Sequence, residues 1–212
     1  SLGEILRKHP QVLIATDDMY EHILLSDNQF VNIVNACPDL HSRTVVLNGV
    51  SKAYSMTGWR IGYCGGPAEI ITAMENIQSQ STSNPCSVSQ AAAEMALNGD
   101  QSCIKPMITA FIERNNFVTE HLNQCNGVQC LKSDGAFYAF ADAREAIERL
   151  HTRGIIKNKN DLEFSEFLLE KSGVAIVPGS AFGSEGYMRL SFATSLDNLT
   201  KALERIRNAL NH

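Results

Sequence analysis

SKAYSMTGWR, residues 51–60, sets the framework for interpreting the rest of this sequence. A short β-branched apolar run precedes it at residues 44–47, and a second apolar run follows at residues 61–64. Runs of this length and composition are typical of buried strands. The pattern therefore predicts that Lys52 lies on a turn at the end of a buried strand.

The side chains around this turn indicate a particular kind of chemistry. A lysine amine forms a Schiff base with a carbonyl compound. Ser51 lies directly before Lys52, and Arg60 lies eight positions after it. A hydroxyl group and a guanidinium fork can together bind a phosphate. The combination predicts a phosphorylated aldehyde as cofactor, whereas Lys52 taken alone would be interpreted as a solvated lysine at a strand end.

A second strand end carries further polar groups. Residues 12–16 form a continuous apolar run after a helix-like segment, which is typical of an α/β sheet that is buried on both faces. Asp17, Asp18 and Tyr20 follow this run. Because ligands of such sheets bind beyond the carboxyl ends of the strands, we expect an acid, a phenol and the Lys52 amine to face one crevice.

The remaining periodicity predicts two successive parts. Helical patterns cover residues 68–80 and 88–98, and a long helical segment over residues 106–126 is suited to connecting two lobes. Strands are then expected at residues 128–131, 136–140, 174–177 and 187–192, and helices at residues 143–150, 162–171 and 196–210. We therefore expect residues 1–105 to form an α/β part with a mostly parallel sheet, and residues 106–212 to form a smaller α+β domain.

Composition argues against several classes of function. The chain has 212 residues and a formal net charge of −5, without a basic stripe of interleaved aromatic residues, so nucleic acid is not an expected partner. No run of 18 apolar residues is present, so no membrane span is expected. The six cysteines form no CxxC motif and predict reduced thiols in a cytoplasmic protein. No histidine, cysteine and carboxylate cluster has the spacing of a metal site.

Five motifs span nearly the whole chain. They are TDDMYE (residues 16–21), SKAYSMTGWRIGY (51–63), GAFY (135–138), VPGSAFG (177–183) and MRLSFA (188–193). In content and order they resemble those of the fold-type I, class I and II aminotransferases that depend on pyridoxal 5′-phosphate, and most closely the bacterial aspartate aminotransferase branch. The resemblance implies the end of a large cofactor-binding domain in residues 1–105 and the small C-terminal domain in residues 106–212.

The resemblance also implies a role for each residue of the cofactor site. Lys52 is similar to the lysine that forms the Schiff base and then moves the proton of the substrate. Asp17 is similar to the carboxylate that holds the proton of the pyridine nitrogen, and Tyr20 to the donor to the phenolic oxygen of the ring. Arg60, helped by Ser51, is similar to the phosphate ligand.

Arg189 is similar to the family's arginine that binds the substrate α-carboxylate. Taken alone, it could be a strand arginine in a surface ion pair. Asp18 is the nearest rival of Asp17, but the family's spacing, with the acid three residues before the tyrosine, favours Asp17. Tyr138 and Phe182 are expected to pack near the cleft.

The expected activity is transamination between an L-amino acid, aspartate or glutamate, and a 2-oxo acid. Members of the family are longer, and their upstream part has no counterpart here, so we expect a C-terminal fragment that is inactive in isolation and belongs to a homodimeric enzyme. Other fold-type I activities stay open, namely an aromatic or prephenate aminotransferase, a β-lyase or a cyclopropane-forming synthase. A non-catalytic aminotransferase-like module is a further alternative. The sequence does not identify the amino-acid substrate.

Overall fold

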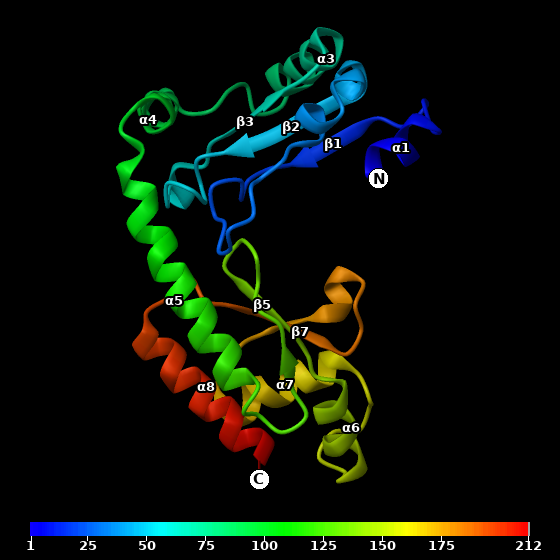
Figure 1. The fold of residues 1–212 in the computed structure, drawn as a ribbon, viewed down its shortest axis with the longest axis vertical. Coiled ribbons are helices and arrows are strands. Elements are labelled where there is room, and N and C mark those ends of the chain that lie inside the picture. The colour runs from blue at the N-terminus through cyan, green and yellow to red at the C-terminus, as the bar shows by residue number, and fades with distance from the viewer. Residues whose placement is uncertain (212) are drawn as a thin grey trace. The chain divides into compact units, whose positions relative to one another are not determined.

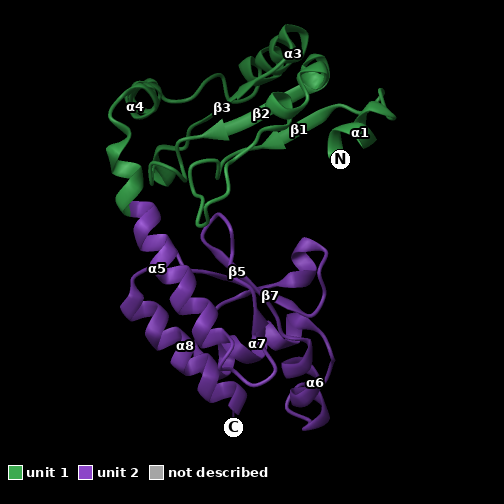
Figure 2. Ribbon diagram, viewed as in Figure 1, with its two compact units in different colours: residues 1–106 green, residues 107–212 purple. Residues whose placement is uncertain are grey.

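The computed structural model describes residues 1–211. The chain divides into two compact units, unit 1 (Ser1–Pro106) and unit 2 (Met107–His212), which Figure 2 shows in different colours. Each unit has its own sheet, and each is described by itself below. The assignment of residues 1–105 to a cofactor domain and of residues 106–212 to a small domain stays a prediction.

Unit 1 contains a three-stranded sheet in the order β1-β2-β3 (Figure 1). Strands β1 (Ile14–Asp17) and β2 (Thr44–Gly49) are parallel, and Asp17 is in register with Leu47. Strand β3 (Gly62–Gly65) is antiparallel to β2. The α/β class is confirmed, but one of the two strand pairs differs from the mostly parallel sheet that we expected. The reason is the link over residues 50–61, which contains no crossover helix of the kind that a parallel return needs.

Helices surround this sheet in chain order. They are α1 (Leu2–Arg7), α2 (Ile33–Ala36), η1 (Pro38–Arg43), η2 (Thr57–Trp59), α3 (Ala68–Ser79), α4 (Ser87–Asn98) and η3 (Gln101–Cys103). The apolar side of α3 is open in the part of the chain that the structure describes, because Met74 is 40% exposed and Ile77 is 72% exposed. The helical periodicity of this segment was therefore informative about its secondary structure and not about its burial.

Helix α5 (Ile104–Leu122) begins in unit 1 and continues into unit 2. The sequence predicted a helix over residues 106–126, and the helix ends earlier because residues 123–127 form a turn. Its buried residues are Phe111, Asn115, Val118, Thr119 and Leu122. They recur every three or four positions, so one stripe of the helix faces the core of unit 2.

Unit 2 contains a four-stranded antiparallel sheet in the order β4-β5-β7-β6. The strands are β4 (Gln129–Cys130), β5 (Tyr138–Asp142), β6 (Val177–Pro178) and β7 (Tyr187–Ser191). Pairing of β6 starts only at Val177, so the predicted strand over residues 174–177 is wrong in extent. Val174 is buried, and its apolar character reflects core packing and not strand pairing.

The helices of unit 2 complete its core. They are α6 (Arg144–Thr152), α7 (Asp161–Ser172), η4 (Gly179–Phe182) and α8 (Leu196–Asn211). Helix α7 packs against α8 and against β6. The fully buried Phe164 and Phe192 lie in this core. Complete burial of such a ring contributes about 1.5–3 kcal/mol, so unit 2 has a hydrophobic core of its own. The helices predicted for this part of the chain are confirmed.

Among residues 1–211, no helix combines the length and the apolar character that crossing a membrane requires. The six cysteines are all free thiols in the structure, and they differ in environment. Burial raises the pKa of the Cys125 thiol to about 11 and also raises the pKa of Cys130. Hydrogen bonds from the backbone N–H groups of Ser89 and Val88 lower the pKa of the exposed Cys86 thiol.

We therefore expect iodoacetamide to label Cys86 well before Cys125 and Cys130, because the thiolate is the reactive form. With a pKa of about 11, about one Cys125 thiol in a thousand is a thiolate at pH 8. Its labelling rate should therefore rise about tenfold per pH unit between pH 7 and pH 9. Peptide mass spectrometry after short exposures measures the order. Equal rates at Cys86 and Cys125 in the folded chain would contradict this account.

Candidate functional site

The candidate site of unit 1 lies at one edge of its sheet. Asp17 is the last residue of β1, and Ser51 and Lys52 follow directly after β2. Because β1 and β2 are parallel, their carboxyl ends meet at this edge. Strand β3 runs back from the same edge, since Gly62 is in register with Gly49, and Arg60 lies two residues before Gly62. Three separate segments thus bring polar side chains to one place.

The turn that carries Lys52 is fixed by its neighbours. Val50 and Ala53 are buried, so they anchor the turn in the core of unit 1 and leave Ser51 and Lys52 partly exposed between them. The Tyr54 N–H donates to the Val50 carbonyl at 3.3 Å. The Lys52 Nζ lies 5.8 Å from the centroid of the Tyr20 ring. The structure therefore brings together the predicted amine and the predicted phenol.

Asp17 and Asp18 have opposite environments. The Asp18 side chain is 7% exposed and accepts hydrogen bonds from the Thr16 hydroxyl, at 2.7 Å, and from the Asn32 amide. Asp17 is exposed, and its carboxylate accepts a bond from the Met19 N–H at 3.3 Å. Within residues 1–211, no cationic side chain pairs with Asp17. Asp18 is committed to the fold, and Asp17 is available to a ligand.

Arg60 adopts an unusual backbone conformation. Its φ of 52° and ψ of 48° place it in the left-handed region, which a residue other than glycine seldom occupies. One guanidinium N–H donates to the Thr57 carbonyl at 2.9 Å, and the side chain is otherwise exposed. Ser55 also has a positive φ, of 54°. The two positions give the segment between Lys52 and β3 a defined local conformation with the guanidinium held near the loop.

Sequence reasoning missed several residues that support this edge. Asn32 binds Asp18 from a distant loop, and the Asn48 amide donates to the Glu21 carboxylate at 2.7 Å. The Tyr54 hydroxyl donates to the Gln101 side chain at 2.8 Å, and burial raises the pKa of Tyr54. Each pair joins segments that are distant in sequence, so no local pattern could have indicated them.

Unit 2 holds the remaining predicted residue, Arg189, in the middle of β7. Its guanidinium carbon lies 4.4 Å from the centroid of the Tyr138 ring and 4.2 Å from that of the Phe182 ring. No carboxylate of the described chain forms an ion pair with Arg189, so the alternative of a surface ion pair does not describe it. Tyr138 and Phe182, expected only to pack near a cleft, contact the arginine itself.

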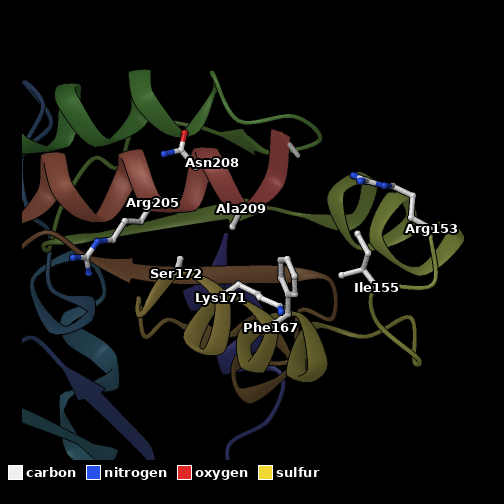
Figure 3. A pocket seen from close by; sticks show the side chains of 8 residues that line it. All are labelled: Arg153, Ile155, Phe167, Lys171, Ser172, Arg205, Asn208 and Ala209. Atoms are coloured by element: carbon white, nitrogen blue, oxygen red, sulfur yellow. The ribbon is translucent and has the colours of Figure 1, made fainter.

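A cavity of about 800 Å³ in unit 2 contains none of these residues (Figure 3). Its lining residues are Arg153, Ile155, Phe167, Lys171, Ser172, Arg205, Asn208 and Ala209. The three cations come from the C-terminal parts of α6, α7 and α8, as Figure 3 shows. Cations at helix C-termini offset the negative end of the helix dipole, so their presence there has a structural explanation.

Comparison with known proteins associates these features with one family. The sequence model of the family described as aminotransferase class I and II matches residues 1–206. An aspartate/prephenate aminotransferase of Nitrosomonas europaea is 70% identical over 210 residues, which cover 99% of this chain and 53% of that protein. An aspartate aminotransferase of Rhizobium meliloti is 49% identical over 208 residues, covering 98% of this chain and 50% of the relative.

Solved structures agree with these sequence comparisons. The crystal structure of the aspartate aminotransferase from Rhizobium meliloti matches with a TM-score of 0.90 and 44% identity, over 99% of this chain and 52% of that one. The aromatic aminotransferase from Pyrococcus horikoshii matches with a TM-score of 0.86 and 32% identity, over 99% and 54%. The chain thus spans about half the length of the curated relatives that it matches.

The contrast between the two aspartates leads to a stability prediction. Asp18→Ala should lower the free energy of unfolding by about 1–3 kcal/mol, because it leaves the Thr16 hydroxyl and the Asn32 amide without their acceptor. Asp17→Ala should change it by no more than about 0.5 kcal/mol. Urea unfolding monitored by the fluorescence of Trp59, the single tryptophan, measures both. A larger loss for Asp17→Ala would reverse the assignment.

Proposed function

The chain belongs to the class I and II aminotransferase family, and on that premise we propose that it supplies the lysine and the carboxylate-binding arginine of an enzyme that transfers an amino group between an L-amino acid and a 2-oxo acid. The observation that carries the proposal is the position of Lys52 over Tyr20, at the sheet edge where Asp17 also ends β1. The activity is proposed for a protein that has this chain together with a counterpart of the rest of its relatives' length.

The residues at this edge fit pyridoxal 5′-phosphate as cofactor. An aldehyde needs an amine, which Lys52 offers. A pyridine nitrogen needs an acceptor, and Asp17 has a carboxylate that no cation of the described chain occupies. The hydroxyl group of Ser51 and the guanidinium of Arg60 suit a phosphate, and the Tyr20 phenol suits the ring oxygen. The donor set therefore matches the chemical groups of the cofactor one by one.

When bound, the cofactor supplies an electron-withdrawing ring that makes the Cα–H bond of an amino acid acidic. Lys52 would hold the cofactor and, once replaced by substrate, its amine would take the proton from the substrate Cα. Asp17 would hold the proton on the ring nitrogen by its negative charge. Ser51 and Arg60 would fix the phosphate, so that the ring cannot rotate away from the amine.

Arg189 would bind the α-carboxylate of the substrate. A planar guanidinium accommodates a carboxylate in a bidentate manner, and this orients the substrate as well as attracting it. We propose aspartate or glutamate as amino donor, since relatives at 70% and 49% identity are named for aspartate. The first of these is also named for prephenate, which makes prephenate the second candidate, as an amino acceptor.

We further propose a homodimer in the cytoplasm for the complete enzyme. The dimer is the usual assembly of this family. The cytoplasmic location is supported by the six free thiols of the chain, which are typical of a reducing compartment. Neither a partner chain nor a location is needed for the experiment that follows.

Reductive labelling tests the assignment of Lys52. The chain is mixed with pyridoxal 5′-phosphate, reduced with borohydride and digested, and the modified lysines are identified by mass spectrometry. We expect Lys52 to take the label at cofactor concentrations at which the exposed Lys8 of the same unit does not. Lys52→Ala should remove the main label, and Lys8→Ala should leave it intact.

The absorption spectrum gives a second readout of the same sample. Bound cofactor should absorb well to the red of the free aldehyde in the wild-type chain and in Lys8→Ala, and not in Lys52→Ala. Asp17→Ala should weaken this band without changing which lysine is labelled, because it removes the partner of the ring nitrogen only. Random labelling of all exposed lysines would reject the proposed cofactor site.

A further inference from the structure

We propose that Tyr138 and Phe182 are positioning residues for Arg189, which hold its guanidinium in one orientation so that its N–H groups are directed at a planar carboxylate. The inference rests on the carboxylate-binding role proposed for Arg189. It adds two aromatic residues whose function is to fix the arginine, and it predicts a measurable property of the side chain in the absence of any ligand.

The geometry of the contact carries the first step. The guanidinium carbon of Arg189 lies over both rings, at 4.4 Å from the Tyr138 centroid and 4.2 Å from the Phe182 centroid. A guanidinium stacks on aromatic rings through its flat faces. Stacking of this kind leaves the N–H groups in the guanidinium plane free to point outward, which is the direction from which a carboxylate binds in a bidentate manner.

The two rings are themselves held by the fold. Tyr138 lies in β5 opposite Ser191 of β7, so the sheet fixes its backbone beside that of Arg189. Phe182 lies in η4, whose Ser180 N–H donates to the buried Asp161 carboxylate at 2.6 Å. At Gly179, the first residue of η4, an added Cβ would lie 2.3 Å from the backbone oxygen of Ser184, so this turn packs too closely for a side chain.

A second arginine near this sheet provides an internal comparison. Arg144 lies over the Tyr187 ring, with its guanidinium carbon 5.5 Å from the centroid. Its Nε donates to the two Asp142 oxygens at 2.9 and 3.0 Å, and this ion pair lowers the pKa of Asp142. Arg189 has the aromatic contacts and, among residues 1–211, no such acid. The N–H groups that Arg144 spends on a protein carboxylate are therefore open to an external one in Arg189.

The exposure of the site is consistent with an external partner. Phe182 is 48% exposed although it contacts both Arg189 and the Phe140 ring, whose centroid is 6.3 Å away. Immobilising a flexible side chain on binding costs about 0.5–1.5 kcal/mol, and a side chain that is already fixed avoids that cost. Loss of one ring should therefore weaken carboxylate binding by about two- to tenfold.

Side-chain NMR on the chain labelled with ¹⁵N-arginine tests the positioning role directly. The order parameter of the Arg189 Nε–H group should approach that of rigid backbone, about 0.85, in the wild type. It should fall clearly in Phe182→Leu and in Tyr138→Leu, and stay high in the aromatic replacements Phe182→Tyr and Tyr138→Phe. Phe167→Leu is the matched control, because Phe167 is a phenylalanine of unit 2 that lines the cavity of Figure 3 and has no ring contact with Arg189.

Titration with succinate separates this inference from the proposed function. Succinate should shift the Arg189 Nε–H resonance in the wild type, with an apparent affinity two- to tenfold weaker in either leucine variant and unchanged in Phe167→Leu. A mobile Arg189 in the wild type, or one equally rigid in both leucine variants, overturns the positioning role. If the order parameters behave as expected and succinate leaves the resonance unmoved, the carboxylate role of Arg189 is what fails.

Discussion

Parallel pairing of β1 with β2 is the constraint on which the candidate site of unit 1 depends. The pairing places the carboxyl ends of both strands at one edge, so Asp17 and Lys52 meet there although 34 residues separate them. The antiparallel return of β3 then adds Arg60 at the same edge. A different direction for either strand would send one of these groups to the opposite edge, where the lysine could not share a ligand with it.

In unit 2 the corresponding constraint is the two-residue alternation of a strand. Met188 and Leu190 are buried, so Arg189 between them must face the other side of the sheet. The same alternation in β5 buries Ala139 and keeps Tyr138 on the side of the arginine. A register shift of one residue would move the guanidinium into the core, where an unpaired charge is very costly. The hydrophobic core therefore specifies the orientation of the arginine.

Much of the fold was predictable from periodicity, because the helices of unit 2 and the strands that flank Lys52 have regular apolar patterns. Local patterns were uninformative where a distant partner decides. Nothing within residues 16–21 shows that Asp18 is buried, since its partner Asn32 comes from another loop. The apolar character of Val174 is the same in a strand and in a buried loop. The direction of β3 and the contact of Phe182 with Arg189 likewise arise only when separate segments pack together.

The left-handed backbone of Arg60 has a consequence for how this region can change. A residue other than glycine pays about 1–2 kcal/mol for that conformation, and glycine pays almost nothing. Position 60 is therefore a place where a glycine would relieve backbone strain, and it is also the place where the guanidinium is to bind a phosphate. Selection for thermal tolerance and selection for cofactor retention would act in opposite directions on this residue. Attempts to stabilise the protein by general rules of backbone preference would thus remove one of the groups on which its proposed chemistry depends.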